Sequence, residues 1–369
     1  MGDVLRFNQG EVWKRIARSA PDLAVIAAAN DRPGLYGGFA LRALRRHGAF
    51  AELLPLAVEF AEFGVDHRRA VADPALIDSV REASGVFFVG GAPQRLARVL
   101  VGTDGSPTPL GSAIAEVHST GGIVVGGIPG SVGLSTGLDA LEALARGRVP
   151  PGQLLRGLGL APEGWFIDQH SFSPGRLAEI LVAMRQLGIA RGIGIGPDTS
   201  AVMAGDKVEV IGDEGILLVA LDKDRTVQDF PEGFRLEGAR LSYLEQGDRF
   251  DMSTLEVTPA AAKLDGFEIE HREEDDGASD GDRPVAVDLF ARGQLPRLLV
   301  EALDGTRREA FAYAFPEGAG GNARGFRFRF HSVPGTMGWL SVDSGRERYT
   351  IVNLGLEITG ARREDMPEP

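Results

Sequence analysis

The sequence predicts an α/β protein with a mostly parallel sheet, helices on both faces of that sheet, and a C-terminal region rich in β-strands. Up to about residue 222, apolar runs of strand length alternate with segments of helical periodicity, the pattern of βαβ units. From residue 284 onward, apolar and polar residues alternate with a period of two between Gly and Pro turns, which indicates antiparallel strands. With 369 residues, 43% of them hydrophobic, the chain can form one large core and a smaller second unit.

The strands expected in the first region are short apolar runs. They cover residues 23–29, 51–55, 85–89, 122–126, 164–167, 200–203, 207–210 and 215–220. The expected helices have apolar residues three and four positions apart, which gives one apolar face. They cover residues 38–46, 93–101, 107–117, 137–146 and 175–187. The last helix follows Ser-Phe-Ser-Pro, and a hydroxyl cap with proline in the first turn is typical of a helix start.

Beyond residue 230 the sequence predicts a strand pair over 243–251 and then an acidic segment, 268–283, that is too charged to pack. We therefore expect an α/β domain over 1–230, a strand pair and acidic linker over 231–283, and a β-rich domain over 284–369. The strands expected in the last domain cover residues 285–290, 310–315, 325–331 and 348–353.

One of these strands has a strict alternation of Phe and Arg. Phe326, Phe328 and Phe330 should share one face, with Arg327 and Arg329 on the other. This pattern fits a half-buried strand with a solvated basic face, and it also fits a ligand groove lined by arginines.

Composition excludes several classes of partner. A net charge of −13 and a pI near 5 leave no excess of Lys and Arg for phosphates, so we expect neither nucleic acid nor an anionic membrane as a partner. The absence of cysteine removes disulfides and thiolate chemistry. No apolar run has the length of a signal peptide core or a membrane span, so we expect a soluble, cytoplasmic protein.

No metal site or cofactor is expected either. The six histidines form no i,i+3 or i,i+4 pair, which gives a zinc site little support. The Gly-Ile-Gly-Ile-Gly stretch at 192–196 lacks the long following helix of a dinucleotide site.

The candidate site lies where the strands end, because ligands of open α/β sheets bind at the carboxyl ends of the strands. Three stretches directly follow expected strands: residues 90–96, 126–135 and 168–177. The first begins Gly-Gly-Ala-Pro-Gln, the second is Gly-Gly-Ile-Pro-Gly-Ser-Val-Gly-Leu-Ser, and the third begins Asp-Gln-His.

Taken in order, these stretches resemble the cyanophycinase and dipeptidase E family of serine peptidases. The family's Asp-Gln-His and Gly-Arg-Leu stand intact at 168–170 and 175–177, segments 192–202 and 208–212 match in order and spacing, and 244–251 resembles the tail of many members. The resemblance covers about residues 3–252. It implies a flavodoxin-like fold, a Ser-His dyad completed by an acid, cleavage of aspartyl or β-aspartyl peptide bonds, and a homo-oligomer.

The nucleophile position has two possible alignments. Aligned without gaps, the family's serine falls on Pro129, which has no hydroxyl, and the protein would be inactive. With two extra residues in the turn, Ser131 becomes the nucleophile and the Val132 N–H the oxyanion donor. Ser131 could equally be a turn serine that caps the following helix.

The other site residues follow from the same resemblance. His170 would be the general base, with Asp168 and Gln169 of its motif among the residues that bind substrate. Gln94 would bind substrate through its amide, with Gly91 allowing close backbone approach, although Pro93 and Gln94 could simply open a helix. The acid of the family's Gly-Gly-Asp-Gln is lost.

The third member of the triad is not assigned. Asp139 and Glu142 lie in the right interval, but both fit a solvated helix face.

Three functions remain open on these residues. The chain is a serine-type peptidase that acts through Ser131 and His170, or an inactive member that binds a peptide or a partner, or an assembly protein whose β-rich region supplies an interface.

Overall fold

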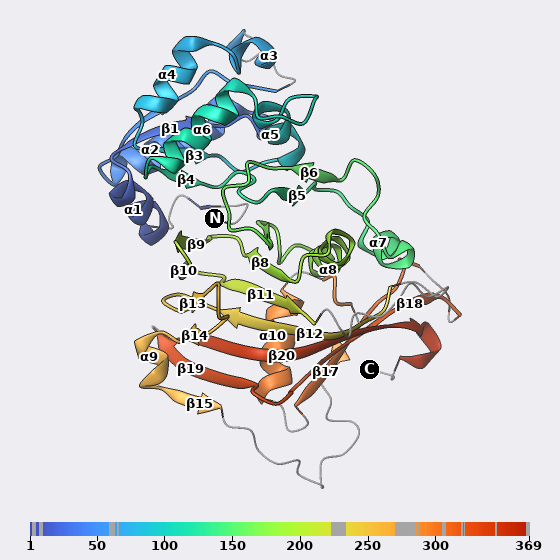
Figure 1. The fold of residues 1–369 in the computed structure, drawn as a ribbon. Helices are drawn as coiled ribbons and strands as arrows, with labels where there is room; N and C mark the ends of the chain where they lie inside the picture. The colour runs from blue at the N-terminus through green and yellow to red at the C-terminus, as the bar shows by residue number, and fades with distance from the viewer. Residues whose placement is uncertain are drawn as a thin grey trace. The chain divides into compact units, whose positions relative to one another are not determined.

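The chain forms two compact units in the computed structural model (Figure 1). The first unit comprises Met1–Gly137, Pro151–Gln169 and Pro197–Ser200; the second comprises Leu138–Pro150, His170–Gly196 and Ala201–Pro369. The structure describes residues 1, 5–6, 10–58, 63–64, 66–222, 234–269, 285–286, 288–291, 293–304, 308–318, 320, 322–343 and 345–366. The expected acidic linker lies almost entirely outside these residues, and the domain boundaries at 230 and 283 stay predictions.

The first unit is built on a parallel sheet with strand order β2-β1-β3-β4. Its strands are β1 (Asp22–Ile26), β2 (Phe50–Leu53), β3 (Gly85–Phe88) and β4 (Ile123–Val125). Val86 and Phe87 of β3 lie between β1 and β4 and are almost fully buried. Such burial on both faces explains why the strand reads as a continuous apolar run.

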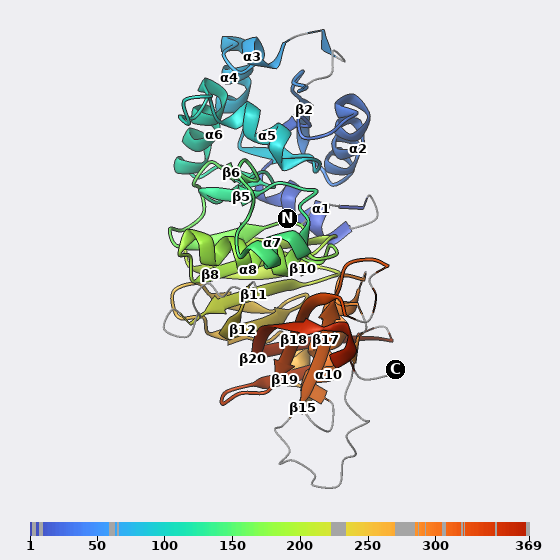
Figure 2. The same cartoon turned by 90° about the vertical axis from the view of Figure 1, so that its right-hand side faces the viewer.

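Helices cover both faces of this sheet (Figure 2). On one face, Trp13 of α1 (Gly10–Ser19) packs against Phe87, with ring centroids 5.3 Å apart. Its neighbour Phe88 joins a core with residues of α4 (Pro74–Glu82), α5 (Pro93–Leu100) and α6 (Pro109–Ser119) on the opposite face. Two further helices, α2 (Pro33–Arg46) and the short α3 (His67–Ala70), complete the described helices of the unit.

Three short strands follow the parallel sheet in the first unit. Strands β5 (Val132–Leu134) and β6 (Leu154–Arg156) form an antiparallel pair, and β7 (Trp165–Asp168) is fully buried. The sequence predicted β7 but neither β5 nor β6.

The second unit contains a long sheet with strand order β16-β17-β18-β20-β12-β11-β8. All neighbours in this order are antiparallel except β16 and β17. The strands are β8 (Arg191–Ile195), β11 (Ile216–Leu221), β12 (Leu236–Leu244), β16 (Val285–Ala286), β17 (Glu309–Ala314), β18 (Arg324–His331) and β20 (Arg346–Arg362). β19 (Met337–Asp343) branches from β20 and pairs with β15 (Phe267–Ile269).

A smaller antiparallel sheet has strand order β14-β13-β10-β9. It consists of β9 (Thr199–Ala204), β10 (Lys207–Gly212), β13 (Arg249–Asp251) and β14 (Val257–Thr258). The described helices of the second unit are α7 (Ala140–Arg146), α8 (Arg176–Leu187), α9 (Ala261–Leu264), α10 (Gln294–Asp304) and the 3-10 helix η3 (Arg363–Asp365). No described helix is long and apolar enough to cross a bilayer.

The predicted α/β class with a parallel sheet and a β-rich C-terminal region is confirmed. The expectation of a mostly parallel sheet is wrong beyond β4, because β8 and β11 pair antiparallel and β9 and β10 belong to the smaller sheet. The expected strand over 285–290 is described only at Val285–Ala286; a turn follows in which the Asp288 carboxylate accepts the Phe290 amide at 2.8 Å.

The Phe-Arg alternation lies on β18, as predicted. Phe326, Phe328 and Phe330 are buried, while Arg327 is exposed and Arg329 half-buried. Arg329 donates to Glu309 on the neighbouring β17 at 2.9 Å. Arg329 on the polar face is thus engaged in surface ion pairing, whereas the Arg327 guanidinium lies over the Phe311 ring, 5.7 Å from its centroid.

A buried ion pair links three parts of the second unit. The Lys263 ammonium of α9 lies 2.7 Å from the Asp248 carboxylate, and both side chains are at most 1% exposed. Asp248 also accepts the Thr350 hydroxyl at 2.7 Å and the amides of Glu245 at 2.9 Å and Ala260 at 2.8 Å. Burial lowers the pKa of Lys263, and Asp248 opposes that shift. The ammonium, the hydroxyl and the two amides together satisfy the Asp248 carboxylate.

Replacing Lys263 with Met should destabilise the protein by about 3–5 kcal/mol, because the Asp248 carboxylate would stay buried without its counter-charge. Urea unfolding measures the loss. Lys207→Met is the matched control, since Lys207 pairs with Asp251 at the surface with a side chain 77% exposed. We expect its unfolding midpoint to stay unchanged, and equal losses in the two variants would contradict the role assigned to the buried pair.

Candidate active site

The chain turns sharply after β4 at two glycines. Gly126 and Gly127 both have φ of +77°, which glycine adopts without strain. A Cβ atom on Gly127 would lie 2.8 Å from the Phe88 ring, so this turn is packed closely against β3. The sequence correctly placed a glycine-dependent turn at the end of the strand.

The turn leads into a hairpin and not directly into a helix. The Pro129 carbonyl accepts the amides of Leu160 at 2.7 Å and Ala161 at 2.9 Å, and the Ser131 carbonyl accepts that of Gly157 at 3.0 Å. Residues 128–134 therefore run antiparallel to 154–161. The expected strand-to-helix turn is wrong here, because β5 stands between the turn and α7.

Ser131 consequently caps no helix. Helix α7 begins at Ala140, and its N-cap is Asp139, whose carboxylate accepts the Glu142 amide at 3.0 Å. This contact gives Asp139 a structural role. Ser131 is exposed at the start of β5.

The register of the hairpin fixes the direction of the Val132 N–H. Ser131 and Gly157 are joined by a hydrogen bond, and Val132 is opposite Arg156. Bonded and non-bonded pairs alternate along an antiparallel ladder. The Val132 N–H therefore points away from β6.

The glycines after β3 make close contacts with another turn of the first unit. Gly91 has φ of +153°, and a Cβ there would lie 2.4 Å from the Ala29 carbonyl oxygen. Gly91 thus allows a close approach to the turn after β1, and its expected part in substrate binding stays a prediction. Asn30 supports the same contact by donating to the Gly90 carbonyl at 3.0 Å.

Gln94 lies in the first turn of α5, which begins at Pro93. This is the helix-opening alternative from the sequence. The half-buried Gln94 amide makes long contacts of 3.4 Å with the Thr136 hydroxyl and 3.5 Å with the Thr136 amide. Gln94 therefore links α5 to the loop after β5.

The Asp-Gln-His motif begins at the end of β7. Asp168 is its last residue and only 3% exposed, whereas Gln169 and His170 are half-buried. The His170 carbonyl accepts the Ser173 amide at 2.8 Å, which closes a turn before α8. Asp168 and Gln169 belong to the first unit, and His170 opens a segment of the second.

Helix α8 begins one residue later than predicted and without a hydroxyl cap. Its N-cap is Gly175, with φ of +75° and no side-chain hydrogen bond. A Cβ on Gly175 would lie 2.6 Å from the Ala140 Cβ, so glycine permits close packing of α7 on α8. The Gly-Arg-Leu motif thus has a packing function.

Asp198 is a polar residue whose role the sequence did not specify. It is 4% exposed, has φ of +52°, and accepts the Arg6 amide at 2.6 Å while its carboxylate pairs with the Arg6 guanidinium. The only available signal was its place within the matching segment 192–202. Among the described residues, no cluster of His, Asp or Glu could hold a metal ion.

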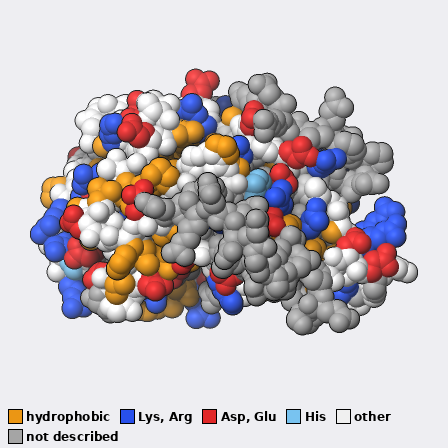
Figure 3. Space-filling model, turned by 90° about the horizontal axis from the view of Figure 1, so that it is seen from below, with side chains coloured by type: hydrophobic (Ala, Val, Ile, Leu, Met, Phe, Trp, Pro, Cys, Tyr) orange, Lys and Arg blue, Asp and Glu red, His pale blue; other side chains and the backbone are white. Residues whose placement is uncertain are grey.

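Charges on the visible part of the second unit are mixed. Figure 3 shows acidic and basic side chains interspersed with hydrophobic ones on the face turned to the viewer. Acidic side chains of the described residues are therefore not gathered into one patch on this visible face.

Gly91→Ala should destabilise the protein by about 3 kcal/mol, because the added methyl group meets the Ala29 carbonyl in a strained backbone conformation. Gly121→Ala is the control: its φ is +97°, but no atom lies within 4 Å of the added Cβ, so only about 1 kcal/mol of strain is expected. Chemical denaturation compares the two. Equal losses would argue against the close backbone contact.

No family model matches the chain. Curated cyanophycinases from Trichormus variabilis and a Nostoc species are each 27% identical to it over 259 residues, which is 68% of this chain and 82% of theirs. A cyanophycinase from Geminocystis herdmanii is 27% identical over 242 residues, 63% of this chain and 83% of its own. The chain is therefore similar to cyanophycinases over about two thirds of its length, which supports the resemblance carried by its motifs.

Proposed function

We propose that this chain is a peptide-binding relative of the cyanophycinases that lacks serine-peptidase activity. The observation that carries the proposal is the hairpin after β4, where Pro129 stands at the nucleophile position of the ungapped alignment. Proline has no hydroxyl and its φ is fixed near −65°, so it can neither attack a carbonyl nor take up a strained nucleophile geometry.

The hairpin also restricts a nearby replacement for the serine. A serine nucleophile needs a tight turn that presents its Oγ together with a neighbouring N–H to the developing oxyanion. The carbonyls of Pro129 and Ser131 are both bonded to the opposite strand, so this segment is held as an extended ladder. To form the tight turn of a serine nucleophile here, this segment would have to break several of these hydrogen bonds.

Changes in a second stretch support the same proposal. In 90–94 the family's acid is absent, Gly91 is packed on Ala29, and Gln94 contacts Thr136. Motifs that hold the scaffold, such as Gly-Arg-Leu at 175–177, are retained. Retention of a scaffold together with loss of catalytic groups is what an inactive, ligand-binding member would show.

A serine peptidase that uses Ser131 is the second candidate, and one observation favours it. Ser131 is exposed, and the adjacent Val132 N–H points away from β6, so it is oriented away from the hairpin ladder. In this alternative Ser131 attacks an aspartyl or β-aspartyl peptide bond, His170 is the general base, and Val132 stabilises the oxyanion.

A serine-directed fluorophosphonate probe separates the two candidates. For an inactive protein we expect no covalent labelling, no hydrolysis of β-aspartyl-leucine, and binding of this dipeptide in calorimetry. Ser131→Ala is compared with Ser112→Ala, which removes another exposed serine, on α6. Labelling and hydrolysis in the wild type and in Ser112→Ala, but not in Ser131→Ala, would establish the peptidase instead.

A further inference from the structure

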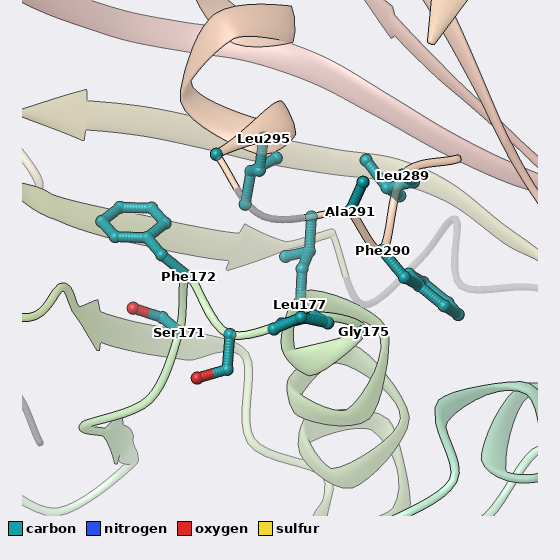
Figure 4. A pocket seen from close by; sticks show the side chains of 11 residues that line it. Ser171, Phe172, Gly175, Leu177, Leu289, Phe290, Ala291 and Leu295 are labelled. Atoms are coloured by element: carbon teal, nitrogen blue, oxygen red, sulfur yellow. The ribbon is translucent and has the colours of Figure 1, made fainter. Parts of the chain in front are cut away.

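Three large apolar side chains lie exposed within five positions of helix α2: Leu35, Tyr36 and Phe39. Interior space is a weaker candidate for binding another molecule. The hollow at the start of α8 leaves about 20 Å³ to the centre of a water molecule, which is room for about one (Figure 4). The exposed surface of α2 is therefore the feature that calls for a partner.

The three side chains form one apolar stripe along the middle of α2. Leu35, Tyr36 and Phe39 are 44%, 42% and 44% exposed. Residues three and four positions apart share a face of a helix, and the Tyr36 and Phe39 rings meet edge-on with centroids 6.1 Å apart. The other side of α2 packs on β2 (Figure 2), where a Cβ on Gly37 would lie 2.5 Å from Leu53. The stripe thus takes no part in the packing of α2 on its own sheet.

A cation lies at each end of this stripe. Arg32 directly precedes α2 and Arg42 lies ten residues later, so the two positions are about 15 Å apart along the helix. The Arg42 guanidinium lies over the Phe39 ring, 4.7 Å from its centroid. Both arginines are exposed, and neither forms an ion pair within the part of the chain that the structure describes, not even with the nearby Asp31. They are available to the carboxylates of another molecule.

Gly38 leaves a gap in the centre of the stripe. Glycine weakens the interior of a helix, and nothing around this position requires it, because an added Cβ would meet only the Arg42 Nη1 at an ordinary 3.6 Å. Gly37, by contrast, is required by the close packing of Leu53. A residue without a side chain on an exposed face allows the backbone of another segment to approach closely.

The charges favour an acidic segment over other occupants. Two copies that met through antiparallel α2 helices would bring Arg42 of one copy close to Arg32 of the other, and α2 contains no acidic residue to offset this repulsion. An anionic bilayer would be repelled by the net charge of −13 on the whole protein. A short helix meets only the local charge, and it can place apolar side chains on the stripe and carboxylates near both arginines.

We infer that the α2 face, made of Arg32, Leu35, Tyr36, Phe39 and Arg42, binds an amphipathic helix of another protein whose apolar stripe is flanked by acidic residues. The Arg42 guanidinium, held over the Phe39 ring, pairs with one of those acids. This interaction surface goes beyond the proposed peptide site and does not depend on it.

The experiment uses the full-length protein and two dye-labelled helical peptides in fluorescence anisotropy. The first peptide carries leucines at helical spacing flanked by glutamates, and the second has lysine in place of every glutamate. Arg42→Glu reverses the charge of the α2 face, and Arg69→Glu makes the same change at an exposed position of α3. Phe39→Ala removes a ring of the stripe, and Phe267→Ala removes an exposed ring from β15.

We expect the wild type and the two control variants to bind the glutamate peptide equally, and Arg42→Glu and Phe39→Ala to bind it at least about tenfold more weakly. Arg42→Glu should in turn prefer the lysine peptide, an inversion that a misfolded variant would not show. Absence of binding to the wild type, equal affinity for both peptides, or equal losses in the control variants overturns the inference.

Two further measurements test the occupants that the charges disfavour. Sedimentation velocity detects self-association, and flotation detects binding to phosphatidylglycerol vesicles. Self-association that is lost only in Phe39→Ala, or vesicle binding that is lost only in Arg42→Glu, overturns the inference in favour of that occupant. Binding of β-aspartyl-leucine should be the same in Arg42→Glu and the wild type, so failure of the α2 face and failure of the proposed function are distinguishable.

Discussion

The second unit depends on the pairing of Lys263 with Asp248. Asp248 lies in the segment 244–251, which resembles the tail of the cyanophycinase family, whereas Lys263 and Thr350 lie beyond the part of the chain covered by that resemblance. A buried carboxylate with a single buried ammonium partner is stable only when its remaining lone pairs are also satisfied. The amides of Glu245 and Ala260 meet that requirement. Lys263 and Thr350, which lie beyond residue 252, are thus joined to the segment 244–251 through the buried carboxylate of Asp248.

Much of the first unit could be predicted because its strands are buried on both faces. Short apolar runs such as 85–89, bounded by glycines and rich in Val and Phe, favour buried strands. Proline at the start of α5 and α6 marks where those helices begin. Strand β8 was missed because glycine alternates with isoleucine at 192–195, and Gly194 is needed where a Cβ would strike Ser171. Glycine in a strand marks such a close approach but weakens the strand signal.

Helix α10 was also missed, although its sequence carries the signal. Its buried residues recur at helical spacing: Leu295, Leu298, Leu299, Ala302 and Leu303. The two-residue alternation of the neighbouring strands dominates that region.

The direction of strand pairing was not predictable from the apolar runs. Whether two such runs pair parallel or antiparallel depends on their connections, which the antiparallel pairing of β8 with β11 illustrates.

In the candidate site, features set by neighbouring residues could be predicted, and features set by residues far away in the sequence could not. That a strand leads into the Asp-Gln-His motif and that Pro93 opens a helix follow from neighbouring residues, and both were predicted, although the strand was expected to end one residue before Asp168. The fate of the 126–135 turn was not, because the partner that draws it into a hairpin is the segment 154–161, some thirty residues later. The glycines of a turn predict the turn itself, but they do not predict which strand pairs with the residues that follow it.

Strand β20 has a consequence for how this chain can be divided. It is 17 residues long and pairs along one edge of β12, whose other edge is taken by β11. A protein ending before β20 would expose the backbone of β12 to solvent over an apolar strand, the kind of open edge at which chains stick to one another. Deletion of the C-terminal residues would therefore yield a self-associating fragment in place of a smaller monomeric core.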